Sequence, residues 1–427
     1  MKRWLPIIVA LLVLAGAIAG SVILPTPQPH GSLMSLPVAR MLACPVGDPN
    51  LGKTKVVVTD QTVFTAGVIN ALPQDPTTTA EFENPEKSII VRGSATVAGI
   101  STNTMTDRPM STVCAPPISF GTWSGVPVQD TAATLILTDV DASSAVVDVS
   151  LFGQTGPMPV AGLRDITVPA GSTQMLAIDQ LVTADAPIAV QVRASKGRVS
   201  ALLRLVGPGG YDWQLPQTAP DTDLVIAGIP GGAGTRTLSI TNADTVNKAT
   251  MYLQVIGSTS TFDPIGLSSI ELLPARTVSI DITQALGGQD SAIHLQSDRP
   301  VSATVMAFGE GWTDITGVSA QPPLGGQVVL PAVGGTLWLA NPTADPATVT
   351  IKGDQDGTNK SKDWEVPPGT VTSVPFPSTG GSAIVSTTSD VVRASLILQD
   401  SSWSILPITG GGVVAQVEVP AYDPGLG

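Results

Sequence analysis

Four tryptophans recur at nearly even intervals and constrain the fold of this chain more than any other feature. The intervals are 90, 99 and 91 residues, and the four residues are Trp123, Trp213, Trp312 and Trp403. A related turn precedes each of them, written TDRPMST, SKGRVSA, SDRPVSA and SDVVRAS (106–112, 195–201, 297–303 and 389–395). A fixed period near one hundred residues indicates tandem copies of one structural template. The sequence therefore predicts several similar modules, each long enough to bury its own core.

The composition and the local patterning of the copies predict β-structure. Of the 427 residues, 43% are hydrophobic and only 13% are charged, while 43 Gly and 37 Pro supply turn residues throughout. Runs such as TLSIT (237–241) and SATVMAF (302–308) alternate with period two, as strands do when one face packs inward. We therefore predict an all-β protein of tandem antiparallel β-sandwich modules of the immunoglobulin-like class.

A β-propeller or another closed all-β assembly is the main alternative fold. Propeller blades run to about 40–50 residues with four strands each, so one copy of the period would have to hold two blades. No half-period is visible within the copies. Separate domains and one closed assembly therefore both stay open at this point.

The period and the composition together give an expected domain organisation. Its parts are an N-terminal transmembrane anchor or signal peptide (1–25), a Pro-containing linker (26–43), a first β module with a disulfide (44–125) and three further β-sandwich modules (126–222, 223–322 and 323–427). A last strand candidate, VVAQVEVPAY (413–422), is expected to complete an edge of the last module or to offer that edge to a partner.

The first residues have the pattern of a targeting segment. Lys2 and Arg3 precede an uncharged run from Trp4 to Leu24, which is just long enough to cross a membrane as a helix. AIA (17–19) resembles a signal-peptide cleavage site, so the segment either anchors the chain by one crossing or is removed on secretion. In both cases we expect the rest of the chain outside the cytoplasm, attached to the cell membrane or secreted.

The two cysteines agree with an extracytoplasmic location. An even pair in an oxidising compartment predicts a disulfide, here between Cys44 and Cys114 at the two ends of the first module. A thiol nucleophile or a metal ligand is the alternative role. Both lack partners, because the chain has only two histidines, His30 and His294.

Residues for catalysis are sparse, and we expect no enzyme activity and no cofactor. Nucleophilic triads and histidine zinc sites need more bases or ligands than His30 and His294 provide. Carboxylates are numerous, but no pair recurs among the copies as the acid pair of a glycan hydrolase would.

One acidic segment has the residue types of a weak Ca²⁺ site. GDQDGTNKSKDWE (353–365) places Asp354, Asp356 and Asn359 on a tight turn, and such hard oxygen ligands suit Ca²⁺. The segment lacks the terminal bidentate Glu of an EF-hand, and the matching loops of the other copies have no comparable acids. A solvated hairpin loop is therefore the favoured interpretation.

The repeated tryptophans allow two roles. An indole can stack on a sugar ring of an envelope glycan, or it can pack within and between modules. One tryptophan per copy at a regular position favours packing.

Charge argues against nucleic acid as a partner. The net charge is −13, and no basic run follows Lys2 and Arg3, so phosphate-backbone binding has no electrostatic basis. The remaining partner classes are other envelope proteins, a glycan, and the membrane through the N-terminal helix.

Several short motifs resemble those of a known family. They are CP (44–45), CAPP (114–117), the tryptophan near 123, LANP (339–342) and the repeated VPAG and VPPG. In these the chain resembles a family of actinobacterial secreted or membrane-anchored cell-envelope proteins of unknown function, over essentially all residues after the anchor. The resemblance implies a cell-envelope role. The chain departs from it at TWSG (122–125), where similar proteins often carry an aromatic pair.

These observations favour a non-enzymatic extracytoplasmic protein that acts as a scaffold or protein-interaction module of the cell envelope. The alternative is an envelope-glycan-binding protein that uses exposed loops.

Overall fold

The computed structural model describes residues 33–35, 40–47, 52–105, 108–208, 210–267, 269–310, 314–355, 358–399, 402–410 and 416–418. Within them the chain is all-β and its sheets are antiparallel, which confirms the predicted fold class at that level. No helix among the described residues is both long and apolar enough to span a membrane. The expected anchor at 1–25 lies outside the described residues.

The chain divides into two compact units, Ala39–Gly412 and a second one made of Met1–Val38 with Val413–Gly427. In the second unit, β1 (Leu33–Ser35) pairs antiparallel with β34 (Gln416–Glu418). The described part of the expected closing strand at 413–422 therefore pairs with the N-terminal segment. The expectation that it completes an edge of the last module stays a prediction.

Within Ala39–Gly412 the strands form four repeats. Repeat 1 (40–113) contains β2 (Arg40–Cys44), β3 (Lys53–Val68), β4 (Thr77–Glu83), β5 (Ile89–Gly93), β6 (Ala98–Met105) and β7 (Arg108–Val113). Repeat 2 (117–214) contains β8 (Pro117–Ile118), β9 (Phe120–Val126), β10 (Ala132–Thr138), β11 (Ala145–Gly153), β12 (Gly156–Pro157), β13 (Ile166–Val168), β14 (Thr173–Ala177), the 3₁₀ turn η1 (Ile178–Gln180), β15 (Ile188–Lys196), β16 (Val199–Gly207) and β17 (Gly210–Gln214).

The second half of the unit continues the same series. Repeat 3 (221–319) contains β18 (Asp221–Ile229), β19 (Thr235–Asn242), β20 (Ala249–Ile256), β21 (Thr261–Phe262), β22 (Ile270–Leu272), β23 (Arg276–Asp281), the one-turn helix α2 (Thr283–Leu286), β24 (Ser291–Phe308) and β25 (Ile315–Ser319). Repeat 4 (326–408) contains β26 (Gly326–Pro331), β27 (Thr336–Asn341), β28 (Ala347–Gln355), β29 (Thr358–Val366), β30 (Thr370–Pro375), β31 (Thr379–Thr387), β32 (Arg393–Gln399) and β33 (Trp403–Ile408).

Each repeat builds two sheets, and the chain passes back and forth between them. In repeat 4 one sheet has the order β26-β31-β28-β29 and the other the order β30-β27-β32-β33. Repeat 2 has the matching orders β9-β15-β11-β12 and β14-β10-β16-β17. The immunoglobulin-like subtype is not confirmed. In repeat 4 the first strand, β26, pairs with β31, the strand before the final hairpin, and immunoglobulin domains have a different strand order. Because the strands of the two sheets are interleaved along the sequence, one period holds two sheets and yet shows no half-period.

Two long strands each serve both sheets of their repeat. The first part of β24 pairs with β18 and β20, and its second part pairs with β19 and β25. In the same way β3 pairs first with β4 and β6 and then with β5. In repeats 1 and 3 the two sheets are therefore joined by continuous backbone.

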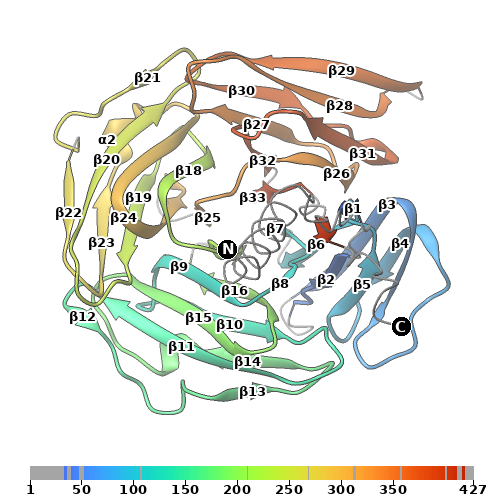
Figure 1. Cartoon of the computed structure of the whole chain (residues 1–427), viewed down its shortest axis with the longest axis horizontal. Helices are drawn as coiled ribbons and strands as arrows, with labels where there is room; N and C mark the ends of the chain where they lie inside the picture. Colours follow the sequence, from blue (N-terminus) through green and yellow to red (C-terminus); the bar gives the residue numbers. More distant parts are fainter. Residues whose placement is uncertain are drawn as a thin grey trace, which may run out of the picture. The chain divides into compact units, whose positions relative to one another are not determined.

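The repeats follow one another around an axis within this unit (Figure 1). The last strands of the repeats lie innermost and contact one another in cyclic order: β7 with β17, β17 with β25, β25 with β33, and β33 with β7. The first long strands of repeats 2, 3 and 4 contact the following repeat, since β9 packs on β24, β18 on β32, and β26 on β3 and β6. The described sheets thus form a closed ring, in which repeat 4 returns to repeat 1.

Apolar side chains fill the space between neighbouring sheets, within and between repeats. In β20 the inward residues Met251, Leu253 and Val255 are buried, as period two requires. Their cluster extends into repeat 4 through Trp338 and Ile397. The predicted boundaries of the four modules stay a prediction, and the apolar clusters of the described residues continue from one repeat into the next.

A buried asparagine explains the LANP motif. Asn341, at the end of β27, is fully buried, and its side-chain amide donates to the backbone oxygens of Asp345 and Val366 at 2.8 and 3.1 Å. Asn242 ends β19 in repeat 3 and donates to Asn247 O at 2.9 Å in the same way. The asparagine amide thus bonds backbone carbonyls of the turn that follows its strand and, in repeat 4, of the end of β29.

Candidate functional site

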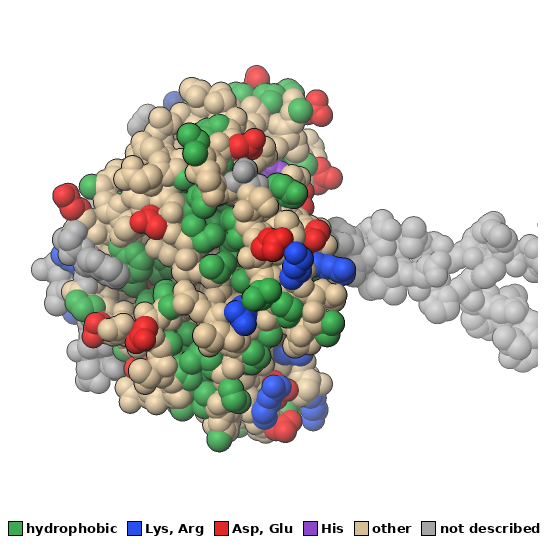
Figure 2. All heavy atoms as spheres, turned by 90° about the vertical axis from the view of Figure 1, so that its left-hand side faces the viewer, with side chains coloured by type: hydrophobic (Ala, Val, Ile, Leu, Met, Phe, Trp, Pro, Cys, Tyr) green, Lys and Arg blue, Asp and Glu red, His purple; other side chains and the backbone are tan. Residues whose placement is uncertain are grey.

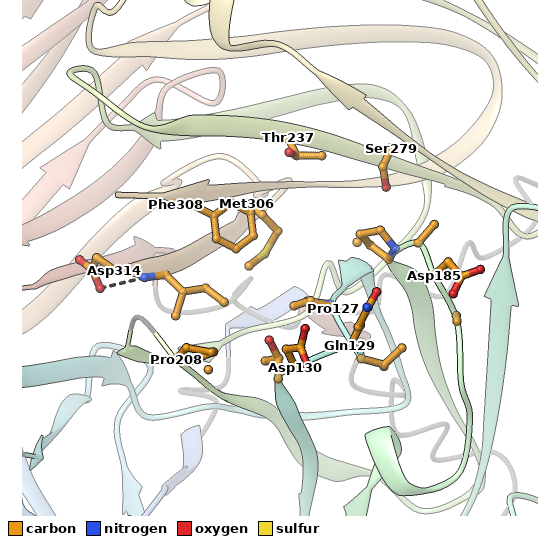
Figure 3. Close-up of a pocket in the computed structure, with 18 residues that line it drawn as sticks. Pro127, Gln129, Asp130, Asp185, Pro208, Thr237, Ser279, Met306, Phe308 and Asp314 are labelled. Carbon is orange, nitrogen blue, oxygen red and sulfur yellow. Dashed lines mark hydrogen bonds between the residues drawn. The ribbon is translucent and has the colours of Figure 1, made fainter. Parts of the chain in front are cut away.

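A cavity of about 540 Å³ lies between repeats 2 and 3, near the inner end of their sheets. Figure 3 shows its lining residues, which come from strand ends and loops of both repeats. Such a volume falls in the range of small-ligand sites. The lining consists of Gly125, Pro127, Val128, Gln129, Asp130, Thr131, Ala184, Asp185, Ala186, Pro187, Gly207, Pro208, Thr237, Ser279, Met306, Phe308, Asp314 and Ile315.

The floor of the cavity is apolar and rigidly held. Met306 and Phe308 belong to β24, and Ile315 begins β25; all three side chains are buried. They pack into the core that also contains Trp123 and the apolar side chains of repeat 2.

The walls come from two loops of repeat 2. Residues 127–131 connect β9 to β10, and residues 184–187 precede β15. Gly125 lies in β9 just before the first loop, and its φ is +80°. A Cβ there would lie 2.3 Å from Ser239 Oγ of repeat 3, so only glycine allows this close approach.

Three carboxylates contribute to the lining. Asp130 and Asp185 are exposed, whereas Asp314 is buried. No lysine, arginine, histidine or cysteine is among the lining residues described for this cavity. The cavity therefore combines an apolar floor with negative charge, which favours a ligand carrying an apolar body and a cationic or hydrogen-bond-donating group.

The Asp314 carboxylate is occupied by backbone donors. It accepts hydrogen bonds from Ile315 N at 2.9 Å and from Trp403 N at 2.6 Å. Burial raises the pKa of Asp314, and these two donors oppose the rise. Asp314 thus links repeat 3 to the start of β33 in repeat 4, at the edge of the cavity.

A buried arginine supports the floor from behind. The Arg236 guanidinium donates to the backbone oxygens of Pro230 (2.7 Å), Gly231 (2.6 Å) and Phe308 (3.3 Å). Its carbon Cζ lies 5.1 Å from the centre of the Trp403 ring. Burial lowers the pKa of Arg236. The residue fixes the β24 backbone at Phe308 against the β18–β19 loop.

A second, more polar cavity of about 380 Å³ adjoins the first and shares Gly207, Pro208 and Asp314 with it. Its other lining residues come from the inner hairpins of three repeats: Met105, Arg108, Met110, Gly210, Tyr211 and Ser402. The inner ends of all four repeats therefore contribute to one hollowed region.

The outer side of repeat 3 is a less specific surface. Five large apolar side chains between residues 246 and 273 are exposed, and Figure 2 shows apolar and polar side chains intermixed over this side. They are Val246, Tyr252, Phe262, Ile265 and Leu273. The ion pair between Lys248 and Glu271 (2.9 Å) lies among them.

The structure joins the two cysteines. Cys44 and Cys114 form a disulfide between the end of β2 and the residue after β7. Both are buried in the core of repeat 1. The predicted bridge is present.

The four regularly spaced tryptophans do not occupy equivalent positions. Trp213 lies in β17 and Trp403 begins β33, each in the last strand of its repeat, whereas Trp123 lies in β9, a first strand paired with β15. Trp312 lies outside the described residues. Trp123 and Trp213 are 0% and 2% exposed, so neither indole can stack on a glycan without opening the fold.

The weak Ca²⁺ candidate falls on a β-hairpin. Asp354 in β28 lies opposite Asn359 in β29, and Asp356 lies outside the described residues. Among the described residues, no group of three or more His, Cys, Asp or Glu is placed to hold a metal ion. His30 lies outside the described residues, and His294 is buried in β24 with its Nε2 2.5 Å from Asp223 Oδ1.

Sequence reasoning missed the cavity, although one signal was present. The connection that leads into β15 covers residues 181–187 in repeat 2. The matching connections into β24 of repeat 3 and β31 of repeat 4 cover only 287–290 and 376–378. The longer connection carries TADAP, which supplies Ala184, Asp185 and Pro187 to the cavity wall. A copy-specific insertion in a repeat protein often marks a binding face.

Fold and cavity together define an all-β ring protein with an acidic, apolar-floored cavity between repeats. The chain belongs to the family of unknown function DUF5719, which residues 112–377 match. No curated protein matches it. A solved structure, a tetra-tandem repeat in the extending region of a large adhesion protein, aligns with 91% of this chain and 98% of its own at 11% identity. Its TM-score is 0.12, so this likeness carries no argument.

Proposed function

We propose that the protein is a non-enzymatic binding protein of the cell envelope, and that the cavity between repeats 2 and 3 receives a segment of a partner protein. The single observation that carries the proposal is the pairing of a buried apolar floor (Met306, Phe308 and Ile315) with exposed carboxylates (Asp130 and Asp185). A peptide segment with an apolar side chain beside a lysine or arginine matches both features.

The position of the cavity supports a binding role. Its walls are loops and its floor is a rigid sheet, the usual arrangement in which a scaffold presents a recognition site. The Asp314 carboxylate already accepts two backbone hydrogen bonds, which suits a structural role better than proton transfer.

An extracytoplasmic location belongs to the same proposal. The disulfide between Cys44 and Cys114 is typical of oxidising compartments. Lys2, Arg3 and the apolar run to Leu24 favour an N-terminal anchor or signal. The scaffold would then act on the outer side of the membrane.

Site-specific photo-crosslinking in intact envelopes tests the partner. A photo-reactive residue replaces Gln129 at the cavity, and the control places it at Gln61, which is also exposed but belongs to β3 of repeat 1. We expect a discrete protein adduct from position 129 only, which disappears when Ala186→Trp fills the cavity. Identical adducts from both positions, or an adduct removed by periodate and hence a glycan, would contradict the proposal.

Calorimetry with defined probes tests the chemistry of recognition. The full-length protein is titrated with N-acetyl-Leu-Lys-amide and with N-acetyl-Leu-Glu-amide. We expect binding of the lysine probe only, weakened by Asp185→Asn but not by Asp75→Asn, which removes the same charge from an exposed loop of repeat 1. Equal binding of the two probes would show that the carboxylates do not select the ligand.

A further inference from the structure

Two buried donors of repeat 2 have no acceptor among the described residues. They are Nε of Arg204 and Nε1 of Trp213, and neither atom is accessible to solvent. Arg204 and Trp213 are directly opposite each other in the β16–β17 ladder, so their side chains lie on the same face. Buried donors without an acceptor are rare in folded proteins, and each one calls for a specific explanation.

The same two residues line one narrow void. It has a volume of about 10 Å³, which is the space that one water-sized sphere occupies. Its other lining residues are Gly47, Asn103, Met105, Val206 and Tyr211, so the void lies between repeats 1 and 2. No carboxylate is among them.

Two other polar side chains of the lining, Tyr211 and Asn103, hydrogen-bond with each other. The Tyr211 hydroxyl donates to the backbone and side-chain oxygens of Asn103, and the Asn103 amide donates to Thr54 Oγ1 at 2.9 Å. The void therefore presents unmatched donors, one of them on a guanidinium, and its chemistry calls for an acceptor.

A second indole in the core has an acceptor for its N–H. Trp123 is also fully buried, and its Nε1 donates to Gln214 O at 3.0 Å. Burial alone thus does not leave an indole N–H unpaired in this fold.

We propose that the void binds a single small hydrogen-bond acceptor, a water molecule or a halide ion, which bridges Arg204 Nε and Trp213 Nε1. The bound acceptor joins the inner hairpin of repeat 2 to β6 of repeat 1. The volume suits a water, and the guanidinium charge suits a monovalent anion.

Crystals of the full-length chain grown in sodium chloride and in sodium bromide test the proposal directly. A peak within hydrogen-bond distance of both donor atoms supports it. An anomalous bromine signal at that peak assigns a halide, and a peak without such a signal in bromide assigns a water. Absence of a peak in both crystals would overturn the proposal.

Thermal unfolding of two matched variants gives an independent readout. Trp213→Phe and Trp123→Phe make the same change in side-chain volume, and each removes one indole N–H donor. With a bound acceptor, the melting temperature falls as much in Trp213→Phe as in Trp123→Phe. If the Trp213 donor is unpaired in solution, its removal relieves an unmet hydrogen bond, and a clearly smaller fall or a rise would refute the proposal.

Discussion

The backbone N–H of Ser111 donates a hydrogen bond to the side-chain oxygen of Ser404 at 2.9 Å, although 293 residues separate them in sequence. Ser111 lies in β7 and Ser404 in β33, the last strands of repeats 1 and 4. Close by, the Ser402 hydroxyl donates to the backbone oxygen of Pro109. The first and last repeats are thus joined by side-chain contacts and apolar packing, without a shared ladder between β7 and β33.

Replacement of Ser404 by alanine should destabilise the ring at this junction. The buried N–H of Ser111 would lose its acceptor, and we expect a loss of about 1–3 kcal/mol in the free energy of unfolding. Denaturant titration followed by tryptophan fluorescence measures it. Ser386→Ala in β31, at a half-buried residue outside this junction, should change stability by less than about 0.5 kcal/mol. Equal effects of both variants would contradict a specific closure contact.

Stability should fall as the pH rises towards 7, because of Asp212 in β17. Burial raises the pKa of Asp212 to about 7, while hydrogen bonds from Gln214 Nε2 (3.1 Å) and Gly317 N (2.7 Å) oppose the rise. Between the ordinary carboxyl pKa and this value the folded state binds more protons than the unfolded state, so each increase in pH favours unfolding. Below this window Asp212 is protonated in both the folded and the unfolded state. Above it Asp212 is ionised in both states, and the free-energy cost of burying its charge is fully present.

Melting temperatures measured from pH 4 to pH 8 test this effect of Asp212. We expect a progressive decrease that becomes shallower in Asp212→Asn, which cannot ionise but can still accept both hydrogen bonds. Asp314 also has a raised pKa through burial and contributes in the same direction, so some slope will remain in the variant. An unchanged slope in Asp212→Asn would show that Asp212 is not the titrating group.

Reduction of the disulfide should weaken the fold. Cys44 and Cys114 are 70 residues apart, and opening so long a loop costs about 2–5 kcal/mol of stability. The double variant Cys44→Ala/Cys114→Ala measures the loss by denaturant titration without a reductant. Addition of a reductant should lower the stability of the unchanged protein to a similar level and leave the variant unaffected. A variant as stable as the oxidised protein would contradict this prediction.

The guanidinium of Arg236 should not be replaceable by an ammonium group. Lysine cannot donate to Pro230, Gly231 and Phe308 oxygens together, and we expect Arg236→Lys to cost about 2–4 kcal/mol. Arg164→Lys, at a side chain that is 69% exposed, serves as the control and should be nearly neutral. Urea unfolding of both variants provides the comparison. Binding of the lysine probe should also weaken in Arg236→Lys, because Phe308 forms part of the cavity floor.

The sequence allowed prediction of the all-β class and of the Cys44–Cys114 bridge, since both follow from local pattern and from residue count. It did not reveal the strand order. Strands such as β10 and β11 are neighbours in sequence but belong to different sheets, so a short window of alternating residues cannot assign them. The regular tryptophan spacing was also partly misleading, because Trp123 lies in a first strand and Trp213 in a last strand.

The cavity was hidden for a related reason. Its floor residues, Met306 and Phe308, follow the ordinary strand pattern of β24 and carry no motif of their own. They meet Asp130 and Asp185 only because repeats 2 and 3 pack side by side. The length of the connection before β15 was the one local sequence signal of the cavity. That signal could be interpreted only once it was known which loops lie together at one end of the ring.

The back-and-forth threading of each repeat has an evolutionary consequence. Among the described residues of repeats 2 and 4, no continuous segment forms one whole sheet, since the strands of two sheets alternate along each of these repeats. Recombination can therefore lengthen or shorten the circle only by whole sheet pairs, and relatives of different size should differ by multiples of the full period.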